Sequence, residues 1–235
     1  MSVHTIILAA GQGSRMKSNK AKVLQRIGGA SMLEKICYTA GAVSSDITLV
    51  VGFDKESVLD EATKFNLNIT SSLQPKPIGT GDAVRCGLDK VQNDSKVLVL
   101  YGDVPLIKKE TLQNLIDSSN SGLSILTTVL DKPFGYGRVK TNSNNEALEI
   151  VEEKDATDEE RQIQEIFTGV LCGSKALIEE GLSKISNNNA AGEFYLTDLV
   201  SVINEKGIRI NTYKASNEEV KGANSKQELL SLIHI

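Results

Sequence analysis

Histidine and cysteine are scarce in this sequence. The two histidines, His4 and His234, lie near opposite ends of the 235-residue chain. Because histidine is the commonest general acid–base group in enzymes, this leaves little room for catalysis by histidine. The three cysteines lie far apart and form no C-x-x-C pair; they are Cys37, Cys86 and Cys172. This pattern fits a reducing compartment and argues against a disulfide framework and against a zinc site.

Long apolar runs and an excess of positive charge are also missing. The apolar stretch at residues 6–10 is too short to span a membrane, and no basic segment precedes it as in a signal peptide. The formal net charge of -4 argues against a nucleic-acid surface, which needs a basic stripe, although a pocket for anions can still be locally basic. We therefore expect a cytoplasmic protein with no nucleic-acid partner and no membrane partner.

The chain does contain a regular alternation of strand-like and helix-like segments. Its first half predicts strands at residues 4–10, 46–52, 67–73 and 96–101, and helices at 31–43, 55–64, 81–90 and 109–118. The first of these helices has Ser31 as its expected N-cap and Glu34 at the capping-box position. Continuous β-branched runs separated by helices indicate an α/β fold with a mostly parallel sheet covered on both faces. Such sheets bind ligands at the carboxyl ends of their strands.

The second half of the chain is less regular. It predicts strands at residues 123–130, 135–141, 147–152, 167–172 and 209–214, and a helix at 196–206. The sequence contains no convincing linker and no internal repeat. We therefore expect a single domain, residues 1–235, in which one sheet carries an elaboration that covers the substrate.

The segment after the first strand, L-A-A-G-Q-G-S-R-M at residues 8–16, has the form of an anion-binding loop. Its two glycines expose backbone N–H groups, and Arg15 and Lys22 add positive charges. Met16 stands where the dinucleotide fingerprint needs a third glycine, and no Lys-Ser/Thr pair completes a P-loop. A tight turn explains the glycines equally well, and both cations could be solvated among neighbouring lysines.

Five stretches together resemble a known family. The loop motif, followed by K-V-L at residues 22–24, is similar to the signature of sugar-1-phosphate nucleotidylyltransferases. The other stretches are L-Q-P-K-P-I-G-T-G (73–81), L-Y-G-D-V-P-L (100–106), G-Y-G-R (135–138) with I-V-E-E-K-D-A-T (150–157), and G-E-F-Y-L-T-D (192–198). In this order, along essentially the whole chain, they resemble the UDP-N-acetylglucosamine pyrophosphorylase branch, which is the uridylyltransferase half of a bifunctional bacterial enzyme.

This resemblance implies a fold and a division of the chain. The fold would be the nucleotide-diphospho-sugar transferase type, a Rossmann-like sheet with helices on both faces and a sugar-binding elaboration. The nucleotide-binding part would cover about residues 1–106, the sugar-binding part about 107–224, and a C-terminal helix about 225–235.

The resemblance also implies the site residues. Arg15 and Lys22 would be catalytic, and Asp103 and Asn224 would bind Mg²⁺, a hard cation that prefers oxygen ligands. The substrate-binding residues would be Leu8, Ala9, Ala10, Gly11, Gln74, Gly79, Thr80, Tyr101, Gly102, Gly137, Glu152 and Asn224.

Within this set, uracil and the sugar would be held by different groups. Gln74 and the turn at residues 79–81 would hold uracil, because an amide offers both a donor and an acceptor. Gly137 would donate its N–H to the sugar, Glu152 would accept from sugar hydroxyls, and Glu153 is expected to face solvent.

Ordinary structural roles remain open for three of these residues. Asn224 could be the N-cap of a helix at residues 225–232, and Thr80 could cap the helix that follows it. Tyr101 could be a core residue, as strand tyrosines often are.

The implied reaction joins UTP and N-acetylglucosamine 1-phosphate. A phosphate oxygen of the sugar phosphate would attack the α-phosphorus of UTP in line, and pyrophosphate would leave. The second pKa of a phosphomonoester is about 6, so the nucleophile is already ionised and no general base is needed. Catalysis would then rest on positioning and charge stabilisation, and the product would feed cell-wall precursor synthesis, peptidoglycan and lipopolysaccharide included.

Three positions depart from the family pattern. Ala21 replaces a proline beside the catalytic lysine, which is expected to loosen the loop. Phe167 replaces an asparagine that contacts the sugar nucleotide, and phenylalanine cannot reproduce the hydrogen bonds of an amide. Lys221 replaces a glutamate and brings a positive charge near Asn224.

The family's second half has no counterpart in these residues. That half is a left-handed β-helix of hexapeptide repeats, with acetyltransferase activity and trimer contacts, so we expect neither from this sequence. Two alternative functions are a uridylyltransferase for another sugar phosphate, such as glucose 1-phosphate, and a nucleotide-binding module without turnover. A Rossmann dehydrogenase is disfavoured by Met16.

Overall fold

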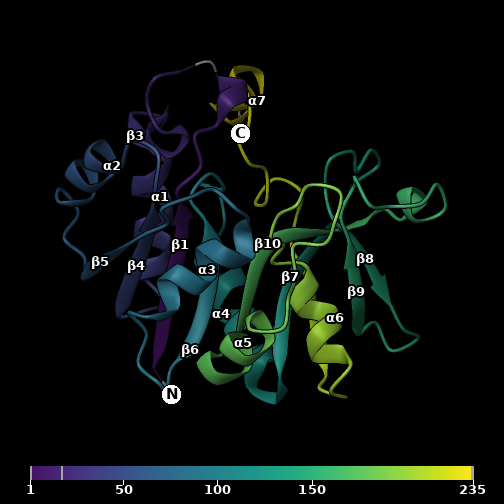
Figure 1. The fold of residues 1–235 in the computed structure, drawn as a ribbon. Helices are drawn as coiled ribbons and strands as arrows, with labels where there is room; N and C mark the ends of the chain where they lie inside the picture. The colour runs from purple at the N-terminus through teal and green to yellow at the C-terminus, as the bar shows by residue number, and fades with distance from the viewer. Residues whose placement is uncertain (1, 17, 234–235) are drawn as a thin grey trace.

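The computed structural model describes residues 2–16 and 18–233 of the chain. His234 and the last residue of the predicted C-terminal helix therefore lie outside the described residues. At the centre of the fold is a nine-stranded sheet with helices on both faces (Figure 1). Its strands are β1 (Val3–Ala9), β4 (Asp46–Val51), β5 (Ile69–Leu73), β6 (Lys96–Tyr101), β7 (Leu123–Val129), β8 (Arg138–Thr141), β9 (Ala147–Val151), β10 (Glu165–Ser174) and β11 (Ile210–Lys214).

The strand order is β11-β7-β10-β6-β1-β4-β5, with β8 and β9 attached beside β10. Neighbours are parallel from β6 through β1 and β4 to β5, and β11 is parallel to β7, whereas β10 is antiparallel to β6, β7 and β8. In the register of the central strands, Leu8 pairs with Tyr101. The segments that follow β1 and β6 therefore leave the sheet side by side, at the edge where an α/β sheet binds its ligands.

Alternating apolar residues of the central strands build two separate hydrophobic clusters. Ile6 and Val99 point to one face of the sheet and Ile7 and Leu98 to the other, because successive side chains of a strand alternate between faces. The first face is covered by α3 (Thr80–Leu88), α5 (Lys175–Leu182) and α6 (Asp198–Asn204); the second is covered by α1 (Met32–Gly41), α2 (Lys55–Ala62) and α4 (Lys109–Ser118). Burial on both faces explains why these strands are continuous apolar runs.

A short hairpin and the last helix form a third apolar cluster. The hairpin strands are β2 (Arg26–Ile27) and β3 (Ala30–Ser31), and the helix is α7 (Lys226–Ile233). Ile27 and Leu232 are both buried in this cluster. The contact brings the C-terminal helix to the same edge of the sheet as the loop after β1 (Figure 1).

The predicted α/β fold is confirmed, and most predicted elements differ from the observed ones by one to three residues at their ends. Ser31 is the N-cap of α1 as expected, since its hydroxyl accepts from the Glu34 amide at 3.0 Å. The sequence reading missed α5, which has eight residues and begins as soon as β10 ends. The strand expected from residue 135 begins at residue 138, because Gly135 has a φ of 84° and belongs to a turn.

No helix among residues 2–16 and 18–233 has the length and apolar character needed to cross a membrane.

Candidate functional site

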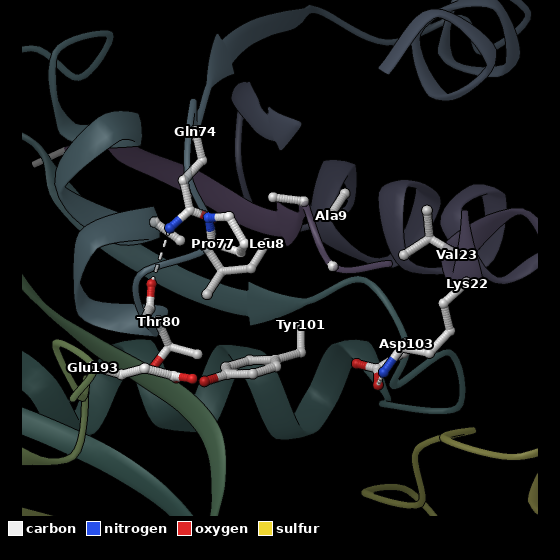
Figure 2. A pocket seen from close by; sticks show the side chains of 14 residues that line it. Leu8, Ala9, Lys22, Val23, Gln74, Pro77, Thr80, Tyr101, Asp103 and Glu193 are labelled. Atoms are coloured by element: carbon white, nitrogen blue, oxygen red, sulfur yellow. Dashed lines mark hydrogen bonds and ion pairs between the residues drawn. The ribbon is translucent and has the colours of Figure 1, made fainter. Parts of the chain in front are cut away.

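Two cavities open where β1 and β6 end. The first has a volume of about 290 Å³ and is lined by Leu8, Ala9, Ala10, Gly11, Lys22, Val23, Gln74, Pro77, Gly79, Thr80, Ala83, Tyr101, Asp103 and Glu193 (Figure 2). The second has a volume of about 210 Å³ and is lined by Tyr101, Asp103, Val104, Gly135, Tyr136, Gly137, Glu152, Phe167, Thr168, Gly169, Thr197, Val220, Gly222 and Asn224. Both cavities are lined by Tyr101 and Asp103, so they meet at the end of β6.

The junction of the two cavities holds a compact polar cluster. The Lys22 ammonium donates to the Asp103 carboxylate and, at 3.0 Å, to the side-chain oxygen of Asn224. Figure 2 shows the Lys22 and Asp103 side chains pointing toward each other. Three groups that are 81 and 202 residues apart in sequence thus converge on one point.

The backbone explains how Asn224 reaches this point. The amide of Ala223 donates to the carbonyl of Asp103 at 3.2 Å, which docks the segment before α7 onto the end of β6. The N-cap of α7 is Ser225, whose hydroxyl accepts from the Glu228 amide at 3.2 Å. The helix-cap alternative for Asn224 is therefore wrong, and its side chain belongs to the polar cluster.

The donor set of this cluster suits a hard divalent cation. The carboxylate of Asp103 and the amide oxygen of Asn224 both accept from the Lys22 ammonium, so two oxygen atoms face one positively charged group. No group of three or more histidine, cysteine or acidic residues that could hold a metal is found within the described part of the chain. A site with one carboxylate is typical of Mg²⁺, which takes its other ligands from water and substrate phosphates.

The glycine loop packs directly against Lys22. Gly13 has a φ of 64°, and a Cβ atom there would lie 2.8 Å from the Cβ of Lys22. Only glycine meets both constraints without strain. The neighbouring Arg15 is exposed and is not among the residues that line either cavity. Met16, at the position of the missing third glycine, is 1% exposed and packs in the interior.

The alanine beside Lys22 anchors the loop. The amide of Ala21 donates to the Asp54 carboxylate at 2.9 Å, and a proline at this position would have no N–H to donate. Ala21 is fully buried. This contact tethers the segment, which is the opposite of the loosening expected from the missing proline.

The far end of the first cavity is formed by Gln74 and the turn into α3. Gln74 donates to the Gly79 carbonyl at 3.0 Å (Figure 2). Gly79 has a φ of 128°, and a Cβ atom there would collide with the Phe194 carbonyl. The Thr80 hydroxyl accepts from the Leu196 amide at 3.1 Å, so it ties two segments together and does not cap α3.

The second cavity is walled by the turn before β8 and by β10. The amide of Phe167 donates to the Gly137 carbonyl at 3.0 Å, and Phe167 is 6% exposed. A Cβ atom on Gly169, whose φ is 89°, would lie 2.5 Å from the Tyr101 ring. This glycine therefore lets the ring sit between the two cavities.

Glu152 lines the second cavity together with a second acidic residue, Asp103. Burial raises the pKa of Glu152, and a hydrogen bond from the Thr197 hydroxyl at 3.0 Å partly offsets that rise. A carboxylate with one oxygen engaged by Thr197 can still accept hydrogen bonds from hydroxyl groups of a ligand.

Glu153 does not face solvent as expected. It pairs with Arg138 at 2.7 Å, and Arg138 is only 2% exposed. The same carboxylate accepts from the Gly135 amide at 3.0 Å, and these contacts lower its pKa. Glu153 therefore fixes the turn that forms one wall of the second cavity.

The structure brings most of the sequence-predicted site residues to these two cavities. Gly102 and Arg15 are the exceptions. Gly102 is buried, and its amide donates to the Leu8 carbonyl at 3.0 Å. Sequence reasoning missed several lining residues, including Pro77, Tyr136, Thr168, Gly169, Glu193 and Thr197. Pro77, Tyr136, Glu193 and Thr197 lie within the five motifs, and Thr168 and Gly169 directly follow Phe167, so their neighbourhood was a usable signal.

A carboxylate near the second cavity carries a prediction about pH. Burial, with the charges of Asp155 and Glu149, raises the pKa of Asp198 from 3.8 to about 6. Asp198 begins α6, where a helix N-terminus favours the ionised form, so burial and like charge outweigh the helix. Because the pKa of Asp198 is higher in the folded protein than in the unfolded chain, protonation of this carboxyl stabilises the fold. This contribution to the free energy of unfolding is fully present below pH 3.8 and is lost as pH rises through about 6.

We therefore expect Asp198→Asn to raise the free energy of unfolding at about pH 8 by roughly 1 kcal/mol, a figure reduced for partial exposure. At about pH 4 the gain should vanish, because Asp198 is then largely protonated in the folded protein and is uncharged, as asparagine is. Urea unfolding of both proteins at the two pH values measures this difference. An equal change at both values would contradict the assignment.

Comparisons with known proteins match this chain along most of its length. A family model described as "MobA-like NTP transferase domain" matches residues 5–179. The chain is 42% identical to a protein of Psychrobacter cryohalolentis called "Bifunctional protein GlmU", over 98% of this chain and 51% of the relative. It is 43% identical to the protein of the same name from Methylococcus capsulatus, over 100% of this chain and 51% of the relative. The chain thus spans about half the length of these curated relatives.

The fold is also similar to a solved structure. The structure is a UDP-glucose pyrophosphorylase complexed with UDP-glucose, with a TM-score of 0.81 and 16% identity over 100% of this chain and 98% of that chain. At this identity the likeness concerns the fold alone, and it agrees with the predicted fold class.

Proposed function

The chain belongs to the family of MobA-like NTP transferase domains, and from this premise we propose that it is a uridylyltransferase that forms UDP-N-acetylglucosamine and pyrophosphate from UTP and N-acetylglucosamine 1-phosphate. The relatives called "Bifunctional protein GlmU" support this choice, because they match almost the whole chain at 42 and 43% identity. They agree with the resemblance that the five sequence motifs indicate.

The observation that carries the proposal is the junction of the two cavities. A transfer of a nucleotidyl group needs two substrates whose reacting ends meet at one charged point. Tyr101 and Asp103 line both cavities, and the cluster of Lys22, Asp103 and Asn224 lies at that junction. The first cavity would take the nucleotide and the second would take the sugar phosphate.

The chain's own residues would act by charge and position. Lys22 would stabilise the negative charge that builds up around the α-phosphorus during in-line attack. Arg15, on the exposed loop, would meet the outer phosphates of the triphosphate. Asp103 and Asn224 would hold Mg²⁺, which when bound would neutralise part of the phosphate charge.

The two ends of the site would bind the base and the sugar. Gln74, Gly79 and Thr80 would hold uracil, with Leu8, Ala9, Ala10 and Gly11 beside the nucleotide. Gly137 and Glu152 would contact the sugar, and Tyr101 would lie between sugar and ribose. In this division residues 1–106 form the nucleotide part and residues 107–224 the sugar part.

Phe167 is the specific reason to keep a second sugar under consideration. Phe167 lines the second cavity and is buried in a hydrophobic cluster. It therefore offers an apolar wall where an amide would offer hydrogen bonds. Without the hydrogen bonds of that amide, one basis for preferring the N-acetyl group is lost, so a uridylyltransferase for glucose 1-phosphate is the alternative.

The test is release of pyrophosphate from UTP with Mg²⁺ and each of three sugar phosphates. We expect kcat/KM to be highest for N-acetylglucosamine 1-phosphate, with glucosamine 1-phosphate and glucose 1-phosphate as the comparison substrates. A preference for glucose 1-phosphate would replace the proposed sugar. No release with any of them, despite binding of UTP, would identify a nucleotide-binding module without turnover.

A further inference from the structure

The side-chain amide of Gln74 is fixed in one orientation by its neighbours. Gln74 is 7% exposed, and its Nε2 atom donates to the Gly79 carbonyl at 3.0 Å and to the Asp82 carboxylate at 2.9 Å. A carbonyl and a carboxylate both accept hydrogen bonds, so the amide nitrogen must face them. Rotating the amide by half a turn would place its oxygen against two other oxygens.

This orientation decides what Gln74 can offer to a ligand. Both hydrogens of the amide nitrogen are used inside the protein, and the remaining hydrogen-bonding atom is the acceptor Oε1. Gln74 lines the first cavity beside Gly79 and Thr80. An acceptor in this wall suits a base that presents an N–H group, and it opposes a base that presents a ring nitrogen with a lone pair.

Uracil and cytosine differ at this point. Uracil carries an N–H at N3, between two carbonyl groups, whereas cytosine has an unprotonated N3. We propose that Asp82 determines the base specificity of the first cavity, by holding the Gln74 amide so that its oxygen accepts from N3–H of uracil and rejects N3 of cytosine. This inference rests on the proposed function, because it assumes that the first cavity takes the base of the nucleotide.

Asp82 is suited to this positioning role by its charge and its place. It lies in the first turn of α3, and hydrogen bonds to an ionised acceptor are roughly twice as strong as neutral ones. Its other carboxylate oxygen lies 3.9 Å from Arg85, whose guanidinium lies 5.2 Å from the centre of the Phe194 ring. A neutral asparagine at position 82 could either donate or accept, so it would remove one of the two acceptors that oppose the rotated Gln74 amide and leave the Gly79 carbonyl as the other.

The test compares UTP and CTP in the wild-type protein and in Asp82→Asn. Equilibrium binding of each nucleotide is measured by calorimetry with Mg²⁺ and without a sugar phosphate. We expect the wild-type protein to prefer UTP and the variant to lose about tenfold of that preference. The matched control is Asp89→Asn, which makes the same change at the exposed end of the same helix and should keep the wild-type ratio.

A second probe needs no variant. N3-methyluridine triphosphate lacks the N3–H group and should bind the wild-type protein at least tenfold more weakly than UTP, as expected for a lost hydrogen bond to a buried group. Equal binding of UTP, CTP and the methylated nucleotide would overturn the inference, even if Asp82→Asn does not fold. Equal weakening of UTP and CTP in Asp82→Asn would also overturn it, because a merely structural residue changes both affinities alike.

The result for base specificity can be distinguished from the result for the transfer reaction. If no sugar phosphate releases pyrophosphate but the wild-type protein still prefers UTP, and Asp82→Asn relaxes that preference, then the proposed function fails and the role of Asp82 stands. If pyrophosphate is released equally well from UTP and CTP, the proposed transfer chemistry stands and the role of Asp82 fails.

Discussion

Replacement of Lys22 by alanine is expected to lower kcat for pyrophosphate release about 10²–10³-fold, by analogy with removal of one electrostatic donor to a developing charge. Lys22 supplies the positive group at the point where the two cavities meet, and it contacts both Asp103 and Asn224. Its charge would oppose the negative charge that grows on the phosphate in the transition state. The measurement is the steady-state rate with UTP, Mg²⁺ and N-acetylglucosamine 1-phosphate.

The control for this variant is Lys20→Ala. Lys20 is exposed two residues earlier and lines neither of the two cavities, so its loss should change kcat less than about threefold. Circular dichroism should show that both variants keep the fold. If Lys22→Ala instead raised KM with kcat unchanged, Lys22 would contribute uniform binding and no transition-state stabilisation.

Asp103→Asn is the second change with a large expected effect. The variant keeps the shape of the side chain and one acceptor oxygen but removes the negative charge, which is the strongest attraction for a divalent cation in the described cluster. We expect kcat to fall about 10²-fold or more, the equivalent of losing several kcal/mol of metal-dependent stabilisation. Binding of Mn²⁺ in the presence of UTP, followed by electron paramagnetic resonance, should weaken in parallel.

The matched control is Asp94→Asn, which makes the same substitution at an exposed position before β6, at the opposite end of the strand. It should leave both the rate and Mn²⁺ binding unchanged. Unaltered Mn²⁺ binding in Asp103→Asn would contradict its assignment as a metal ligand. The double variant with Lys22→Ala should lose less than the product of the two single effects, because the two side chains are in contact and act together.

The sequence was most informative where one local rule applied to one segment. Ser31 and Glu34 predicted the start of α1 because a capping interaction involves residues three apart. The continuous apolar runs of β1, β4 and β6 predicted a sheet buried on both faces. The boundaries of β6 and α4 agree with the prediction to the residue.

Local rules failed where a distant contact decided the outcome. The proline-to-alanine change at position 21 suggested a looser loop, but Asp54 accepts from the Ala21 amide and tethers it. Glu153 follows a strand and looked like a solvent-facing carboxylate, but Arg138 and Gly135 hold it. Asp54 lies too far along the chain for a motif around Ala21 to contain it. Gly135, Arg138 and Glu153 do lie within the quoted motifs, but their order in the sequence does not show that these groups contact one another.

Sequence by itself determined the fold class, the family resemblance and the stretches that contain the candidate site, because strand and helix periodicity and motif order are properties of short segments. Only the tertiary structure decided which side chains share one point. Asn224 had a helix cap as its rival role until the backbone bond from Ala223 to Asp103 brought it to Lys22. The orientation of the Gln74 amide likewise depends on Gly79 and Asp82. Hydrogen-bond direction and charge convergence are set by atoms in space, and spacing along a chain does not encode them.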